Sequence, residues 1–67
     1  MTAAQFEHLD APAAEQVLRS RFTELARAGY EPATALVLAS HVEADLDLAI
    51  DLLERGCPPE TALRIVL

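Results

Sequence analysis

Apolar positions recur every three or four residues along most of the chain, the spacing that places them on one face of an α-helix. Glycine and proline interrupt this pattern at few places, which divides it into four helical stretches joined by short corners. No alternating pattern is long enough to predict a strand. We therefore expect an all-α fold, with a lead-in segment at residues 1–10 and helices at about 11–28, 32–42, 45–55 and 59–67.

The residues that flank these stretches are suited to starting and ending helices. Asp10 and Asp45 precede the first and third stretches, and aspartate is a favoured N-cap. Gly29 and Gly56 follow the same two stretches, and glycine adopts the left-handed conformation that closes many helices. Proline begins the second and fourth stretches, where its missing N–H costs nothing. The corner from Gly29 to Pro32 and the corner from Gly56 to Pro59 therefore have a similar sequence. This similarity indicates either a two-unit helical repeat or a turn geometry that the two corners share.

Each stretch has an apolar face that predicts a place in one aliphatic core. On the third helix, Leu48 and Leu52 fall outside the inner face and make a second apolar stripe. Either the last helix covers them through Leu63 and Val66, or they remain exposed as a recognition patch. The expected inner positions are Leu18, Phe22 and Leu25 in the first helix, Ala35, Leu38, Ala39 and Val42 in the second, and Leu46, Ala49, Ile50 and Leu53 in the third.

The charge balance narrows the range of partners. The 67 residues include five basic and eleven acidic side chains and no lysine, for a net charge of -6. Binding to nucleic acids or anionic membranes depends on basic residues, so we expect neither partner. No apolar run reaches membrane-spanning length, and the first residues do not resemble a signal peptide. We therefore expect a cytoplasmic protein.

Residues that could support chemistry are few and scattered. His8 and His41 lack metal-ligand spacing, and Cys57 has no histidine nearby in sequence to activate it. The acidic residues around the start of the third helix lack the ligand pattern of a calcium loop. They favour a solvated helix start, or the steering of a basic partner. We predict no enzyme, no metal and no cofactor.

The corner at Gly29 and the third helix resemble the ubiquitin-associated (UBA) domain family. Ala28, Gly29 and Tyr30 occupy the position of its Met-Gly-Phe corner, and an alanine-leucine stripe follows on the next helix. The segment DLDLAIDLL, from Asp45 to Leu53, looks like the third helix of the version found at the start of bacterial elongation factor Ts. The resemblance implies a UBA-like three-helix bundle, here with an additional short C-terminal helix.

The resemblance also implies a small, non-catalytic protein-binding adaptor or regulator. Its apolar patch would lie at the corner and the end of the third helix. Tyr30 would be either an interface anchor or a side chain that packs back on its own core. Ala28 stands where ubiquitin-binding members use a methionine, which argues against ubiquitin as the partner. Together with the second apolar stripe, the expected patch comprises Ala28, Gly29, Tyr30, Leu48, Leu52 and Leu53.

Other functions remain open on the sequence alone. One is a homodimer whose last helices pack together and hide Val66 and Leu67; another is a structural subunit of a larger assembly. A transcription-linked regulator would need a basic recognition helix, and none of the expected helices is basic. The bias toward alanine, leucine and arginine, without lysine, is typical of a high-GC bacterial source.

Overall fold

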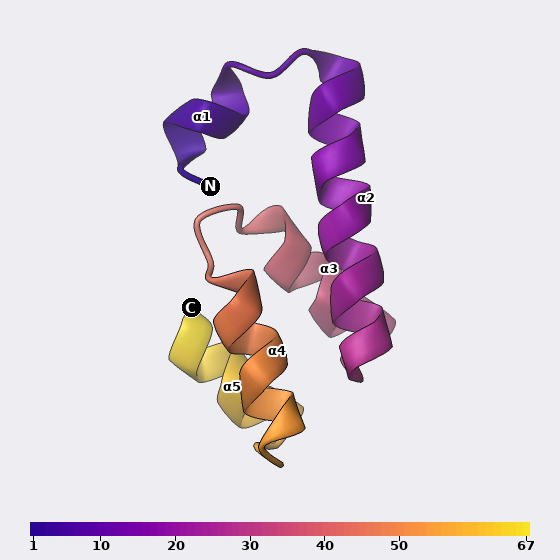
Figure 1. The fold of residues 1–67 in the computed structure, drawn as a ribbon, viewed down its shortest axis with the longest axis vertical. Helices are drawn as coiled ribbons and strands as arrows, with labels where there is room; N and C mark the ends of the chain where they lie inside the picture. The colour runs from indigo at the N-terminus through magenta and orange to yellow at the C-terminus, as the bar shows by residue number, and fades with distance from the viewer.

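The computed structural model describes residues 1–67 and contains five helices and no strand, which confirms the all-α prediction. In Figure 1, α3 crosses behind α2 and α5 lies behind α4. The main packing pairs are α2 with α3, α2 with α4, and α4 with α5. The helices are α1 (Ala3–Glu7), α2 (Ala11–Ala28), α3 (Pro32–Ser40), α4 (Leu46–Glu54) and α5 (Pro59–Val66).

Local capping interactions set the helix ends. The Asp10 carboxylate accepts a hydrogen bond from the N–H of Ala13 at 2.9 Å, and the Asp45 carboxylate accepts one from the N–H of Leu48 at 3.1 Å. Gly29 ends α2 with a φ of 121°, a conformation that side chains with a Cβ rarely adopt. These interactions depend on residues close in sequence, so the expected bounds of the first helix agree with those of α2 at both ends.

The other expected helices differ from the observed ones by one or two residues. The second was expected to reach residue 42, but α3 ends at Ser40 because the chain turns there. The N–H of His41 donates to the Leu38 carbonyl at 3.2 Å, and the N–H of Ala44 donates to the His41 carbonyl at 2.9 Å. These short-range bonds replace the next helical turn. Helix α4 is one residue shorter than expected at each end, and α5 is one residue shorter at its C-terminal end.

The first ten residues contain a helix that the sequence analysis did not anticipate. Thr2 and Gln5 form a reciprocal capping box: the N–H of Gln5 donates to the Thr2 hydroxyl at 3.1 Å, and the N–H of Thr2 donates to the Gln5 side chain at 3.0 Å. The Ala3 N–H donates to a Glu43 carboxylate oxygen at 3.1 Å. The lead-in is thus a short helix, α1, attached to the turn between α3 and α4.

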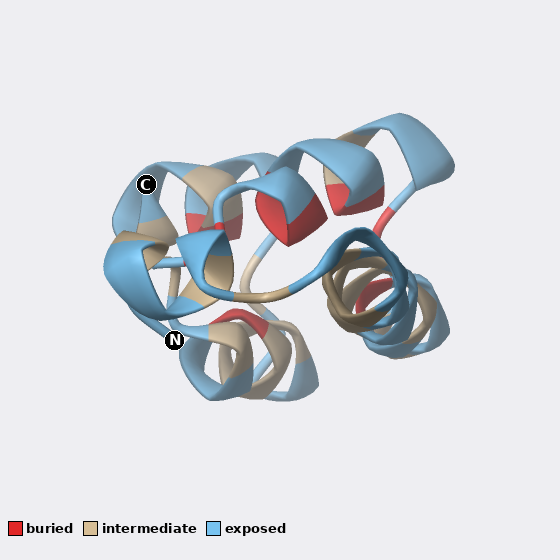
Figure 2. Cartoon of the chain, turned by 90° about the horizontal axis from the view of Figure 1, so that it is seen from above, coloured by how far each residue is buried: buried red, intermediate tan, exposed pale blue.

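The core is small and rich in alanine. Only eight of the 67 residues are buried, and Leu25 and Leu38 are the largest fully buried side chains. Figure 2 shows that the buried positions lie on the inner sides of the helices, with the outer sides exposed. Alanine lets helix backbones approach closely but contributes little buried area. The buried residues are Leu25, Tyr30, Ala35, Leu38, Ala39, Val42, Ala49 and Ala62.

Tyr30 joins the corner after α2 to the middle of α4. Its side chain is only 3% exposed, and its hydroxyl donates a hydrogen bond to the Ala49 carbonyl at 2.7 Å. Burial of the ring and, to a smaller extent, the negative charge at Cys57 raise the pKa of Tyr30 above its ordinary value of 10.0. The folded protein therefore favours the neutral, hydrogen-bonded phenol.

Arg21 joins α2 to the end of α3 and the turn that follows it. Its Nε donates to the Ala39 carbonyl at 3.3 Å, and its Nη2 donates to the carbonyls of His41 at 3.1 Å and Ala44 at 3.2 Å. The end of a helix carries unpaired carbonyls and a partial negative charge, so a guanidinium is well suited to this position. Arg21 is therefore a structural residue rather than part of a basic binding surface.

Arg21→Ala should lower the free energy of unfolding by about 1–3 kcal/mol, because it leaves three carbonyls, two of them partly shielded, without a charged donor. Urea denaturation followed by circular dichroism measures this change. Arg19→Ala is the matched control, since Arg19 only approaches the exposed Glu15 at 4.0 Å and should matter by less than about 1 kcal/mol. Equal effects of the two substitutions would contradict the role of Arg21.

Raising the pH above 10.0, the ordinary pKa of tyrosine, should destabilise the fold. The unfolded chain then loses its phenolic proton before the folded chain does, so the free energy of unfolding falls with rising pH until the folded phenol also ionises. No lysine and no second tyrosine ionise in this range. Urea titrations at several alkaline pH values test this. Tyr30→Phe should be less stable at neutral pH but show a flatter alkaline dependence, and an unchanged slope would contradict the assignment.

Candidate binding surface

The structure brings the Gly29 corner next to the end of α4. A Cβ placed on Gly29 would lie 3.7 Å from Cδ1 of Leu53. Ala28 is half-buried beside them, and a shallow hollow between α2 and α4 is lined by Ala28 and Ile50 together with charged side chains. The two parts of the expected patch are therefore neighbours in space.

Most of the apolar side chains of that patch are nevertheless unavailable to a partner. Tyr30 is buried, so the structure supports the alternative in which it packs back on its own core. Leu52 and Leu53 are half-buried and pack against the core cluster. Leu63 and Val66 of α5 pack against the same cluster. Sequence spacing placed these side chains on α4 but could not show what α5 would cover.

Two members of the expected patch remain at the surface. Leu48 is 37% exposed, and Gly29 is exposed but has no side chain to contribute. A single leucine is ordinary on a protein surface and does not form an apolar patch. The corner therefore offers little apolar area in this conformation.

The larger uncovered apolar face lies on α3, and the sequence analysis did not select it. Leu36 is 62% exposed and Val37 is 43% exposed. Ala33 and Ser40 lie on the same side of the helix and are also exposed, which gives the spacing of one helical face. We call these four residues the α3 stripe. The signal was present in the segment PATALVLAS, which has no charged residue to mark a side for solvent.

A groove between α2 and α3 extends this apolar face. Leu18 and Phe22 line it from α2, Leu36 lines it from α3, and its volume is about 550 Å³. Leu18 and Phe22 were expected to be core residues, but both are only half-buried. The full lining of this α2–α3 groove is Glu15, Leu18, Arg19, Phe22, Pro32, Ala33 and Leu36.

The charges at this groove balance although the chain is strongly acidic. Glu15 and Arg19 are its only charged lining residues, and their side chains are 75% and 69% exposed. The closest approach between their charged groups is 4.0 Å, a weak exposed pair. The α3 stripe adds no charge. The groove and the stripe therefore form a nearly neutral surface on a chain of net charge -6.

The acidic side chains collect elsewhere, along α4. A second hollow there is lined by two apolar residues, Leu48 and Ile50, and by four carboxylates. One of them, Asp51, forms an ion pair with Arg55 at 2.8 Å. This arrangement resembles a solvated helix face more than a binding site for an apolar ligand. The four acidic residues are Asp45, Asp47, Asp51 and Glu54.

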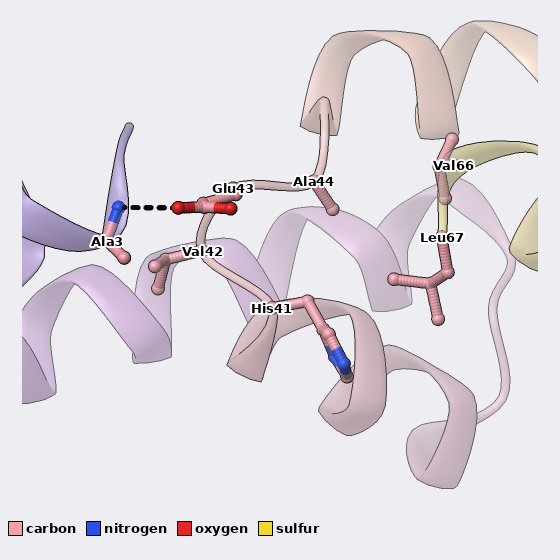
Figure 3. A pocket seen from close by; sticks show the side chains of 7 residues that line it. All are labelled: Ala3, His41, Val42, Glu43, Ala44, Val66 and Leu67. Carbon is pink, nitrogen blue, oxygen red and sulfur yellow. Dashed lines mark hydrogen bonds between the residues drawn. The ribbon is translucent and has the colours of Figure 1, made fainter.

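A third hollow lies between the turn after α3 and the end of α5, with a volume of about 480 Å³. Figure 3 shows Glu43 turned toward Ala3 while the His41 ring points the other way. Glu43 accepts the Ala3 N–H, and Nδ1 of His41 lies 2.8 Å from the Val37 carbonyl. Both polar side chains are thus engaged with the backbone, and they do not converge as an acid–base pair would.

The structure places no cluster of ligating side chains together. No group of three or more histidine, cysteine, aspartate or glutamate residues is arranged to hold a metal ion. Cys57 is half-buried, and its Sγ lies 3.6 Å from the Pro58 carbonyl. None of the five helices combines the length and the apolar character needed to cross a membrane.

Comparison with known proteins identifies no relative. No protein-family model matches the chain. No curated protein and no solved structure matches it either. The resemblance to the UBA family therefore stays a prediction from the sequence, and function has to be argued from the surface itself.

Proposed function

We propose that this chain is a small, non-catalytic protein-association module that binds through the α3 stripe and the α2–α3 groove. The observation that supports this most strongly is the exposure of Leu36, at 62%, on a helix with no charged residue. A helix that carries no charge on any side and is mostly apolar is typical of one that is covered on every side. In the isolated chain only the inner side of α3 is covered.

The physical chemistry of the surface also supports association. Fully burying a leucine or valine side chain is worth about 1.5–3 kcal/mol, and Leu36 and Val37 leave much of that unused. Protein interfaces have centres depleted in charge and rims that are polar. The lining of the α2–α3 groove is mainly apolar and includes only two charged residues, Glu15 and Arg19, both of them exposed.

We further propose that α2, α3 and α4 form a UBA-like three-helix unit to which α5 is added. The order and packing of these helices support this, since α2 packs on both α3 and α4. The proximity of Gly29 to Leu53 also fits a corner that faces the end of the third helix. Because α5 and the core take up most of the corresponding apolar patch, the proposed contact surface moves to α3.

Leu36→Glu should abolish association while leaving the fold intact, because Leu36 is mostly outside the core. A tagged chain is incubated with lysate of its source cells, and the recovered proteins are quantified, including untagged copies of the chain. We expect recovery to fall roughly tenfold or more, as for a central interface residue. Helical circular dichroism checks that the variant folds.

Ile65→Glu is the matched control, since Ile65 is 54% exposed on α5, away from the groove. It should leave recovery close to that of the unmodified chain. Undiminished recovery with a folded Leu36→Glu variant would remove the α3 surface from the proposal.

A further inference from the structure

We propose that the occupant of the α3 surface is a second copy of this chain, with α3 packed antiparallel against α3 of the other copy about a twofold axis. This inference rests on the proposed function and names the partner for the same surface. It differs from the homodimer considered on the sequence alone, which placed the last helices at the interface.

The order of residues in the α3 stripe is self-complementary. Its bulky members, Leu36 and Val37, are central, and its small members, Ala33 and Ser40, lie at the ends. In an antiparallel pair with the axis between Leu36 and Val37, each Leu36 faces Val37 of the other copy. Each Ala33 then faces Ser40 of the other copy. A twofold axis requires this kind of match between a surface and itself.

The small residues at both ends allow the two helices to approach closely. Burying Ser40 would leave no unsatisfied donor, because its hydroxyl already donates to the Val37 carbonyl at 2.8 Å. A buried hydroxyl without a partner would cost about 1–3 kcal/mol, and this contact avoids that cost. The stripe can therefore be covered by another apolar helix without a polar penalty at its end.

The charges favour a second copy over a basic partner. Two chains of net charge -6 repel each other wherever their acidic faces meet. The α3 surface adds little to this repulsion: Glu15 and Arg19 supply one charge of each sign, the carboxylates of α4 border a different hollow, and the exposed Glu31 lies at the N-terminal end of α3. A basic partner would gain more from the acidic α4 face than from this neutral one.

The size of the surface sets the expected strength. A stable interface takes about 800 Å² from each partner, against a total accessible surface of 4485 Å² for this chain. With nine residues, α3 is only about 14 Å long and cannot supply that area alone. The flanking groove residues of α2 must therefore take part. Because α3 is so short, the interface is small even with them. We expect dissociation in the micromolar range rather than the nanomolar range.

Sedimentation equilibrium of the full chain over a wide concentration range tests the proposal. The mass should rise from the 7.3 kDa of one chain toward twice that value. Leu36→Glu should keep the chain at the lower mass, and Ile65→Glu should behave like the unmodified chain. A mass of one chain at every concentration would overturn the inference, as would a dimer that Leu36→Glu leaves unchanged.

A cross-linking experiment tests the register without relying on a disruptive substitution. In a Cys57→Ser background, Ala33→Cys and Ser40→Cys chains are prepared separately and oxidised alone or as a mixture. The antiparallel pairing predicts that the mixture forms a disulfide-linked heterodimer in preference to either homodimer. Cross-linking that is no better in the mixture would overturn the proposed arrangement.

The two proposals can fail separately. If the chain stays monomeric while recovery of other proteins from lysate still depends on Leu36, this inference fails and the proposed function stands. If the chain is monomeric and Leu36 affects no recovery, both fail.

Discussion

Close approach of the helices is the constraint on which the rest of this structure depends. Four of its eight buried residues are alanines, and only Leu25 and Leu38 are large and fully buried. Such a core gains little from each side chain, so it is stable only if the backbones come near enough to exclude water. Polar contacts from Tyr30 and Arg21 hold that arrangement. Both reach backbone carbonyls on a neighbouring element rather than other side chains.

These contacts leave α3 fixed but only half covered. The Tyr30 bond to α4 positions the corner just before α3, and Arg21 binds the carbonyls at its end. Between these points, Ala35, Leu38 and Ala39 fill the inner side. Residues on the outer side reach none of the other helices closely enough to be buried. The same packing that stabilises the fold therefore produces the exposed apolar stripe.

Much of the fold was predictable because its signals are local. Asp10, Gly29 and Asp45 act on residues a few positions away, so they set helix ends whatever the tertiary structure. The capping box at Thr2 was equally local and was overlooked. The direction of Tyr30 and the partial burial of Leu52 depend on elements distant in sequence, which periodicity cannot resolve. The outer face of α3 could not be predicted for a different reason: α3 has no charged residue on any side, so its pattern does not distinguish inside from outside.

Both the stability of the fold and the proposed association with a partner depend on α3. A partner that binds only the folded state stabilises it by mass action, and the gain grows with the partner's concentration. When the partner is a second copy, the fold becomes more stable as the chain accumulates. A core with so few large buried side chains has much to gain from this coupling, since α3 would then be covered on both sides. An apolar outer face on α3 is thus consistent with a small domain that obtains part of its burial from outside itself.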